Sequence, residues 1–319
     1  TGVVSGVGTA GGPALVSYTL PTGCRRTVFV SVNPISPVSG TLSICPSGTT
    51  TLTSAPAGGT WASSNTSVAT IGSSSGLVNG LTSGTTNITY AIATSGCSST
   101  AVVTVNATAP ITGGTSVCTG STLALSNTVS GGTWSSSTTS VGTINATSGA
   151  FAGLTAGTTT VSYTSPASCL VTSIITVNAT PSAVTASGGG TFCGSTSISA
   201  TGGAGGTIYY QGTTSGGTST ATPSASQNVT SSGTYYFRSQ SSSGCWGPEG
   251  SVTVTINPNP AAISGTPLVC AGTPTPLAST TSGGVWSSAN TVIATIGSAT
   301  GSLFGVSAGT VNISYTIPA

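Results

Sequence analysis

The most reactive side chains of this sequence are eight regularly spaced cysteines. Four of them each precede a predicted second strand of a repeat: Cys45, Cys118, Cys193 and Cys270. The other four open a predicted last strand: Cys24, Cys97, Cys169 and Cys245. Regularly spaced cysteines of this kind indicate disulfides formed in an oxidising compartment. A metal site is a minor alternative, because the chain has no Cys-x-x-Cys motif and no histidine.

Catalysis has almost no residues to use. Only four side chains are formally charged, Arg25, Arg26, Arg238 and Glu249, and the chain has no His, Lys or Asp. General acid–base catalysis needs a group that titrates near neutral pH, and a Ser or Cys nucleophile needs a base or a cation to activate it. Calcium sites need several carboxylates. The sequence therefore predicts that the protein is not an enzyme and holds no cofactor or metal.

The same lack of charge limits the partners and the pH response. A net charge of +2 without clustered Lys and Arg predicts no nucleic-acid binding. No apolar run approaches the roughly 18 residues of a membrane span. With one carboxylate and no histidine, we predict a nearly flat melting temperature from about pH 3 to pH 8.

One stretch of 33 residues organises the chain and occurs three times. It runs from Gly58 to Tyr90 (GGTWASSNTSVATIGSSSGLVNGLTSGTTNITY), from Gly131 to Tyr163 and from Gly283 to Tyr315. Within a repeat, short runs such as 68–71, 87–92 and 101–105 alternate apolar with small polar residues. This period of two, interrupted by Gly, Ser, Asn and Pro, predicts half-buried strands of a β-sandwich with the tryptophan between its sheets.

The shared Trp-(Ser/Ala)-Ser, (Ala/Gly)-Thr-Ile and (Ala/Ser)-Gly-Thr motifs, followed by the tyrosine, resemble bacterial Ig-like domains of group 2. Such domains occur in tandem in large secreted adhesins and surface proteins. The resemblance implies an all-β chain of tandem Ig-like β-sandwich domains, forming an elongated rod or filament at the bacterial cell surface. One divergent block looks like another Ig-like module, common in giant surface proteins of gliding, Bacteroidetes-type bacteria.

The expected domains follow from these matches. They are the C-terminal part of a repeat at 1–34, repeats at 35–108 and 109–180, the divergent module at 181–259, and an incomplete repeat lacking its last strand at 260–319.

Two disulfide pairings are compatible with an Ig-like repeat. Bridges within each repeat would join Cys45 to Cys97, Cys118 to Cys169 and Cys193 to Cys245. In a standard Ig topology, however, these positions lie at opposite poles, about 20 Å apart, whereas a disulfide needs Cα atoms within about 7 Å. Bridges between successive repeats would join Cys45 to Cys169 and Cys118 to Cys245. Both pairings remain open from the sequence.

The two ends of the sequence match complementary parts of a repeat. Either the natural chain continues, or the strand Arg25–Val32 of one molecule completes the last domain of a neighbour by strand addition. Strand addition would propagate as a filament and would place Cys24 near the partner position of the Cys270 repeat. Residues 1–21 and 300–318 match the same part of the repeat, which counts against a simple swap.

The sequence favours an extracellular structural protein, the shaft of a surface filament or an adhesin stalk. Its partner would be itself, through self-association or continuation of the chain. The alternative is a carbohydrate-binding or cell-adhesion module that recognises surface glycans with an aromatic platform of Trp246, Tyr209 and Tyr235. Core packing is the simpler interpretation of these aromatic residues.

Overall fold

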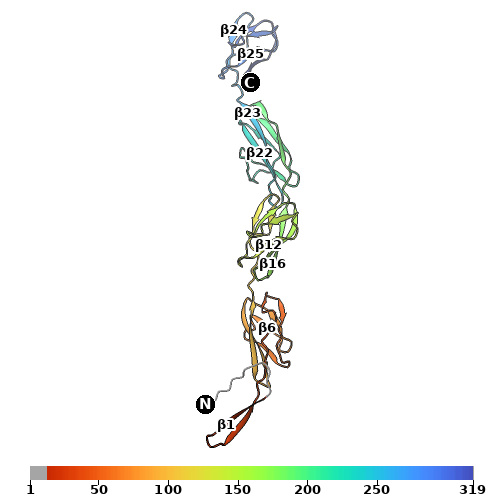
Figure 1. Ribbon diagram of the computed structural model, residues 1–319. Coiled ribbons are helices and arrows are strands. Elements are labelled where there is room, and N and C mark those ends of the chain that lie inside the picture. The colour runs from red at the N-terminus through yellow and green to blue at the C-terminus, as the bar shows by residue number, and fades with distance from the viewer. Residues whose placement is uncertain (1–12, 319) are drawn as a thin grey trace. The chain divides into compact units, whose positions relative to one another are not determined.

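The fold is all-β, as the sequence predicts. The computed structural model describes residues 13–318, so the first twelve residues of the expected 1–34 segment lie outside the described residues. Within residues 13–318 the chain forms strands and no helix. The strands build a hairpin and four Ig-like sandwiches in tandem (Figure 1). The hairpin and the first two sandwiches belong to one compact unit, 1–178, and the last two to another, 179–319.

The first sandwich pairs a four-stranded with a three-stranded sheet. The larger sheet has the order β3 (Ser43–Ile44), β9 (Cys97–Val105), β8 (Gly84–Ile92), β5 (Thr60–Ser63). The smaller one has the order β4 (Thr49–Thr51), β7 (Leu77–Gly80), β6 (Ala69–Ile71). All neighbours are antiparallel except β3, which runs parallel to β9.

The second sandwich repeats this arrangement, and the third repeats the four-stranded sheet, but the first strand of its smaller sheet precedes the whole larger sheet in sequence. In the second, the sheets are β10 (Ser116–Cys118), β16 (Leu170–Asn178), β15 (Gly157–Thr164), β12 (Thr133–Ser136), and β11 (Thr122–Ala124), β14 (Ala150–Gly153), β13 (Gly142–Ile144). In the third, they are β18 (Gly190–Cys193), β23 (Gly250–Asn257), β22 (Gly233–Gln240), β20 (Thr207–Tyr210), and β17 (Val184–Ser187), β19 (Thr196–Gly202), β21 (Ser226–Val229). The domain boundaries themselves stay predictions.

The fourth sandwich and the hairpin have fewer strands. The fourth sandwich has β24 (Pro274–Pro276), β27 (Ser302–Gly305) and β26 (Ala294–Ile296) in one sheet, and β25 (Val285–Ser288) with β28 (Ile313–Thr316) in the other. The hairpin pairs β1 (Ala14–Thr19) with β2 (Arg25–Val30). Within the described residues neither hairpin strand belongs to a larger sheet.

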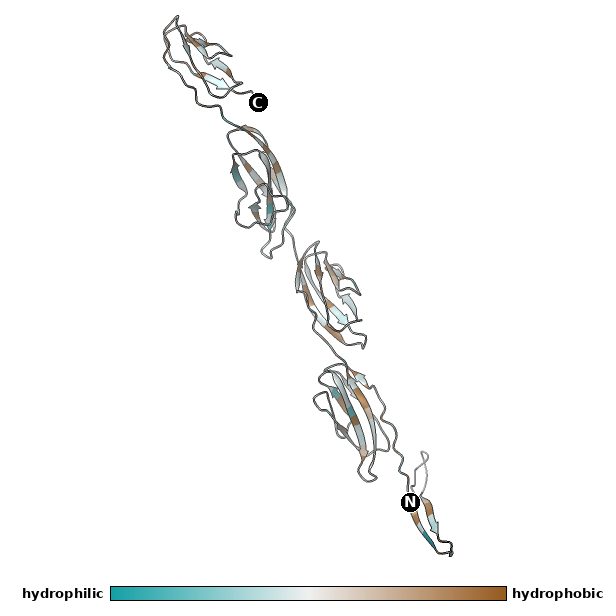
Figure 2. Cartoon of the chain, turned by 90° about the vertical axis from the view of Figure 1, so that its left-hand side faces the viewer, coloured by the Kyte–Doolittle hydropathy of each residue, from teal (hydrophilic) through white to brown (hydrophobic). Residues whose placement is uncertain are grey.

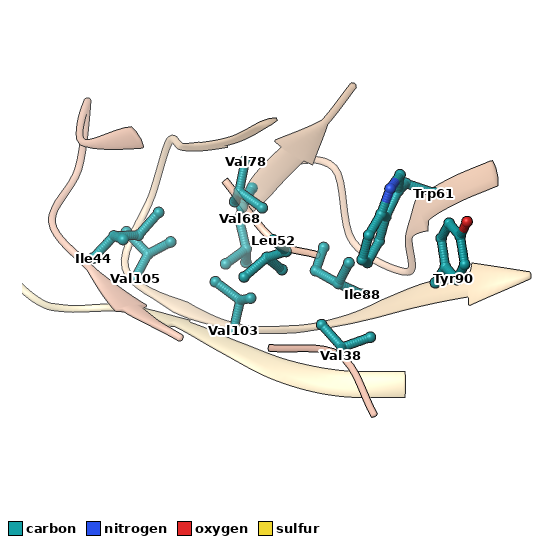
Figure 3. Close-up of a cluster of buried hydrophobic side chains, with 11 residues drawn as sticks. Val38, Ile44, Leu52, Trp61, Val68, Val78, Ile88, Tyr90, Val103 and Val105 are labelled. Carbon is teal, nitrogen blue, oxygen red and sulfur yellow. The ribbon is translucent and has the colours of Figure 1, made fainter. Parts of the chain in front are cut away.

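The core of each sandwich comes from the alternation along its strands. Hydrophobic residues alternate with hydrophilic ones along many of these strands (Figure 2). In the first sandwich, Val78, Ile88 and Val103 are fully buried between the sheets (Figure 3). Trp61 lies against Tyr90 at the end of this cluster, with ring centroids 4.6 Å apart. The repeated Trp and Tyr form the same pair in the second and fourth sandwiches.

A glycine two residues before each of these three tryptophans makes room for the tyrosine that the tryptophan contacts. The Tyr90 hydroxyl accepts a hydrogen bond from the Gly59 N–H and donates one to the Pro56 carbonyl. A Cβ atom on Gly59 would lie 2.4 Å from Cζ of Tyr90. Gly132 and Gly284 are in equally close contact with Tyr163 and Tyr315.

We therefore expect Gly59→Ala to lower the unfolding free energy of the first sandwich by about 1–3 kcal/mol, because the added methyl group overpacks the corner. Tyr90→Phe should cost a similar amount, since it removes the partner of two backbone groups. Val102→Ala is the matched control, because Val102 is 52% exposed on β9. Urea unfolding measures all three, and an unchanged midpoint for Gly59→Ala would contradict this explanation of the motif.

Hydroxyl groups, rather than charged groups, make side-chain hydrogen bonds inside the sandwiches. In the first sandwich, Ser63 donates to the Ala69 carbonyl and lies 2.9 Å from the buried Thr86 hydroxyl. Ser136 and Thr159 repeat the arrangement in the second sandwich. No buried side-chain nitrogen or oxygen of the described residues lacks a hydrogen-bond partner. Because unpaired buried polar groups are costly, this pairing allows a Ser- and Thr-rich chain to pack.

Candidate functional site

A disulfide joins the first sandwich to the second. Cys45, which directly follows β3, is bonded to Cys169, which directly precedes β16, with Cα atoms 5.6 Å apart. Cys169 is 1% exposed. Its N–H donates to the Ser165 hydroxyl, and its carbonyl accepts from the Ser165 N–H. Cys169 therefore enters the disulfide from a hydrogen-bonded turn and not from a loop without such contacts.

The strand register explains why Cys45 does not pair within its own repeat. Ile44, the neighbour of Cys45, pairs with Val105 at one end of β9, whereas Cys97 opens β9 at the other end. Eight residues of strand separate these ends, about 26 Å at 3.3 Å per residue. The pairing of Cys45 with Cys97 is therefore wrong.

The other within-repeat pairings are wrong as well. Cys169 is bonded to Cys45 and so is not bonded to Cys118. Cys193 is a free thiol, whereas Cys245 is disulfide-bonded. Of the two between-repeat bridges expected, Cys45–Cys169 is present in the structure. Cys118 and Cys245 are both disulfide-bonded, and their bond to one another stays a prediction.

Four cysteines are free thiols: Cys24, Cys97, Cys193 and Cys270. Cys97 is half-buried, and its sulfur lies 3.6 Å from the Asn33 carbonyl oxygen. The other three are exposed. Residues 13–318 contain no group of three or more His, Cys, Asp or Glu side chains that could hold a metal ion.

The expected aromatic platform is only partly assembled. Tyr235 is 6% exposed, in the core of the third sandwich, where its hydroxyl donates to the Ser231 carbonyl. Its ring stacks on Tyr210. Tyr235 was therefore wrongly assigned to a ligand platform, because alternate residues of β22 face the core.

The rings of Trp246 and Tyr209 are in contact, but the guanidinium group of Arg238 lies over the Trp246 ring. Their ring centroids are 5.7 Å apart, edge to face. The Arg238 guanidinium lies 5.4 Å from the Trp246 ring centroid. Arg238 also donates hydrogen bonds to the carbonyls of Gly247, Gly216 and Gly217. The arrangement is a cation–π contact inside a network that holds the 211–217 loop.

Glu249 also holds this loop. Its carboxylate accepts hydrogen bonds from the Gly216 N–H and the Ser215 hydroxyl. These bonds, with a smaller contribution from Arg238, lower the pKa of Glu249 below its usual value. No sequence motif predicts this role of Arg238 and Glu249. Their rarity was the available signal, because they are the only charged residues between 181 and 259.

The pH dependence of stability should follow from two groups. The pKa of Glu249 is lowered in the folded chain, so its contribution is present above the unfolded pKa and is lost as pH falls through the folded pKa. Because the carboxyl group is largely solvated, the loss should be small. Burial, then repulsion from Tyr235, raises the pKa of Tyr210, so its contribution is lost above about pH 10.

We therefore expect the range of flat melting temperature, predicted from the sequence as about pH 3 to pH 8, to narrow to about pH 5 to pH 8, with a slight fall in acid and another in alkali. Calorimetry across this range measures it. Glu249→Gln should abolish the acid fall and Tyr210→Phe should reduce the alkaline one. A steep transition between pH 5 and pH 8 would contradict this account.

The described residues contain no helix that is long and apolar enough to cross a membrane. No protein-family model matches the sequence, and no curated protein matches it.

Several solved structures do match. A C-terminal 282-residue fragment of intimin, solved with the intimin-binding domain of its translocated receptor, is 16% identical over 48% of this chain and 67% of that chain, with a TM-score of 0.36. Domains 4–9 of the surface layer protein SbsC are 14% identical over 87% of this chain and 60% of that chain, with a TM-score of 0.20. The Bacteroides ovatus glucan-utilisation protein SGBP-B, solved with a mixed-linkage heptasaccharide, is 14% identical over 82% of this chain and 74% of that chain, with a TM-score of 0.17. Similarities this weak carry no argument about function.

Proposed function

We propose that this chain is an extracellular structural protein, the shaft of a surface filament or adhesin stalk of Bacteroidetes type. The Cys45–Cys169 disulfide carries this proposal, because it covalently joins two successive sandwiches close to the connection between them. A covalent bond beside a short connection restricts bending between the two sandwiches. Such a restriction suits a shaft that transmits force and serves no evident purpose in a soluble enzyme.

Composition supports the same function. Disulfides form and persist in oxidising compartments, which favours a location outside the cytosol. A surface of Ser, Thr, Gly and Asn with almost no charge is insensitive to salt and pH. Near-zero net charge also removes the repulsion that keeps molecules apart and so favours association.

Electron microscopy of the native material with an antibody against residues 181–259 tests the proposal. We expect gold label on filaments or stalks outside the cell, removed by protease treatment of intact cells. Label confined to the cytoplasm would refute the proposal.

Glycan binding is the second candidate, favoured by the contact between Tyr209 and Trp246. Arg238 over the Trp246 ring counts against it, because a sugar would have to displace the guanidinium. We expect no saturable binding when the chain is titrated with surface polysaccharides. Binding that Trp246→Ala abolishes, with Tyr18→Ala as the exposed aromatic control, would support the second function instead.

A further inference from the structure

The fourth sandwich contains an apolar groove where the other sandwiches have a strand. A cavity of about 770 Å³ lies between its sheets, lined by Leu268, Val269, Leu277, Leu303, Val311 and Ile313. In the first sandwich the corresponding place, beside β8 and β3, is filled by β9, whose Val103 and Val105 are buried. Among the described residues β28 pairs with β25 only.

Side-chain exposure marks the groove as open. Ile88 on β8 is fully buried, whereas its counterpart Ile313 on β28 is only half-buried. Val269, which corresponds to the buried Ile44 of β3, is likewise only half-buried. The groove therefore presents apolar walls and a strand edge with unpaired backbone groups, which together suit an added strand.

The hairpin presents the complementary strand. Residues 24–33 (CRRTVFVSVN) align with residues 97–106 (CSSTAVVTVN) without a gap. On this alignment Val30 corresponds to the buried Val103, and Phe29 corresponds to the exposed Val102. Val28, on the same face as Val30, is 58% exposed, so an apolar side chain on this face of β2 is available for burial.

We propose that β2 of a second copy of this chain fills the groove in the fourth sandwich of the first copy, where β28 replaces β1 as its partner, and that the four free cysteines form two disulfides across the junction. The proposal deepens the shaft function and rests on it, because it names the partner that extends the shaft. Val28, Val30 and Val32 would enter the groove as Ala101, Val103 and Val105 fill the first sandwich. The groove of one copy takes the strand of the next, so the contact is heterologous and need not close, which allows the assembly to extend as a filament.

The observed disulfide specifies how these thiols pair. Cys45 follows the β3 strand of one sandwich and is bonded to the cysteine that precedes the closing strand of the next sandwich. Cys193 and Cys270 occupy the first kind of position, and Cys24 and Cys97 the second. A completed fourth sandwich would therefore bond its Cys24, supplied by the second copy, to Cys193. Its own Cys270 would bond to Cys97 of the second copy.

The surroundings of these cysteines would bring the members of each pair, Cys24 with Cys193 and Cys97 with Cys270, close together. Cys193 lines a small cavity of about 180 Å³ with Tyr315, Thr316, Ile317 and Pro318. Tyr315 and Thr316 end β28, and Ile317 and Pro318 follow it, on the side where the turn to a closing strand, and hence Cys24, would lie.

The position of Asn33 would bring the second pair, Cys97 and Cys270, together. Asn106, the counterpart of Asn33, donates two hydrogen bonds to the Ile44 carbonyl beside Cys45. Once β2 fills the groove, Asn33 would therefore lie beside Val269 and Cys270. Since the Cys97 sulfur lies 3.6 Å from the Asn33 carbonyl, Cys270 and Cys97 would become neighbours.

Each bond forms by thiol–disulfide exchange. A thiolate of the pair attacks a small-molecule disulfide such as oxidised glutathione and releases one glutathione thiol. The second thiolate then attacks the mixed disulfide and releases the other. Two protein thiols are thus oxidised to one disulfide, and one glutathione disulfide is reduced to two thiols.

Isotope mixing tests the proposal directly. Unlabelled and ¹⁵N-labelled chains, purified in reductant, are mixed in equal amounts and oxidised with glutathione disulfide. The mixture is digested with a protease that cleaves at aromatic residues and is analysed by mass spectrometry. We expect the pairs Cys24–Cys193 and Cys97–Cys270, with mixed-isotope pairs as abundant as the two uniform kinds together. Free thiols, uniform pairs only, or the pair Cys24–Cys270 would overturn the proposal.

Two substitutions on β2 provide the matched control. Val30→Asp places a charge on the face that enters the groove, and Phe29→Asp places it on the opposite face. Both residues lie in the hairpin, outside every sandwich core, so neither change unfolds a sandwich. We expect Val30→Asp to abolish the ladder of oligomers on non-reducing electrophoresis and Phe29→Asp to preserve it. Equal effects of the two variants would contradict the strand register.

Native material separates this proposal from the shaft function. Reducing, denaturing electrophoresis of labelled filaments should show a subunit of the size of this chain. If one far larger polypeptide appears instead, its own repeats fill the groove and the junction proposal fails, although the shaft function stands. If the label lies inside the cell, the shaft function fails.

Discussion

Breaking the Cys45–Cys169 bond should increase the extended length of a single stretched molecule by about 400 Å. The two cysteines are 124 residues apart in sequence, and an extended chain spans about 3.3–3.6 Å per residue. While the bond is intact, force passes through it, and most of the first two sandwiches carries no load. After the bond is broken, both sandwiches lie in the path of the force and unfold.

Single-molecule force spectroscopy measures this length in a Cys118→Ser/Cys245→Ser background, which isolates the bond. The same molecule is stretched with and without reductant, and Cys45→Ser/Cys169→Ser in that background is the control that reductant should not lengthen. Equal lengths in both conditions would show that the bond does not form and would contradict the proposal of a disulfide-reinforced shaft.

Replacing the tryptophan of the fourth sandwich should unfold that sandwich, whereas the same change in the first should only weaken it. Truncating a buried tryptophan costs about 3–5 kcal/mol. The core of the first sandwich has eleven buried residues, whereas that of the fourth has four. Since stability comes chiefly from buried apolar area, the fourth sandwich has the smaller reserve.

Hydrogen exchange of Trp61→Ala and Trp286→Ala compares the two losses directly. Amides of β25 to β28 should lose all protection in Trp286→Ala, whereas amides of β8 and β9 should keep measurable protection in Trp61→Ala. A peptide of residues 24–33, added to the unsubstituted chain, should raise the protection of β28 if the groove accepts that strand. Equal protection of the two sandwiches before substitution would contradict the argument from core size.

The position of the strands was predictable, because side-chain alternation has a period of two and the turn residues interrupt it. The expected strands at 68–71, 87–92 and 101–105 lie in or overlap β6, β8 and β9. The sequence predicts less well which aromatic residues face the core. Tyr209 and Tyr235 both lie in strands rich in aromatic residues, where hydrophobicity does not identify the inward face. Tyr235 faces the core and Tyr209 contacts Trp246.

Residue types and their local spacing are enough to predict the β-sandwich repeat and the scarcity of catalytic groups. The pairing of the cysteines depends instead on contacts between strands that are distant in sequence. The spacing of 52 residues between Cys45 and Cys97 fits either pairing equally well. The choice depends on β3 lying parallel to β9 beside its far end, and that register is a non-local consequence of packing two sheets together.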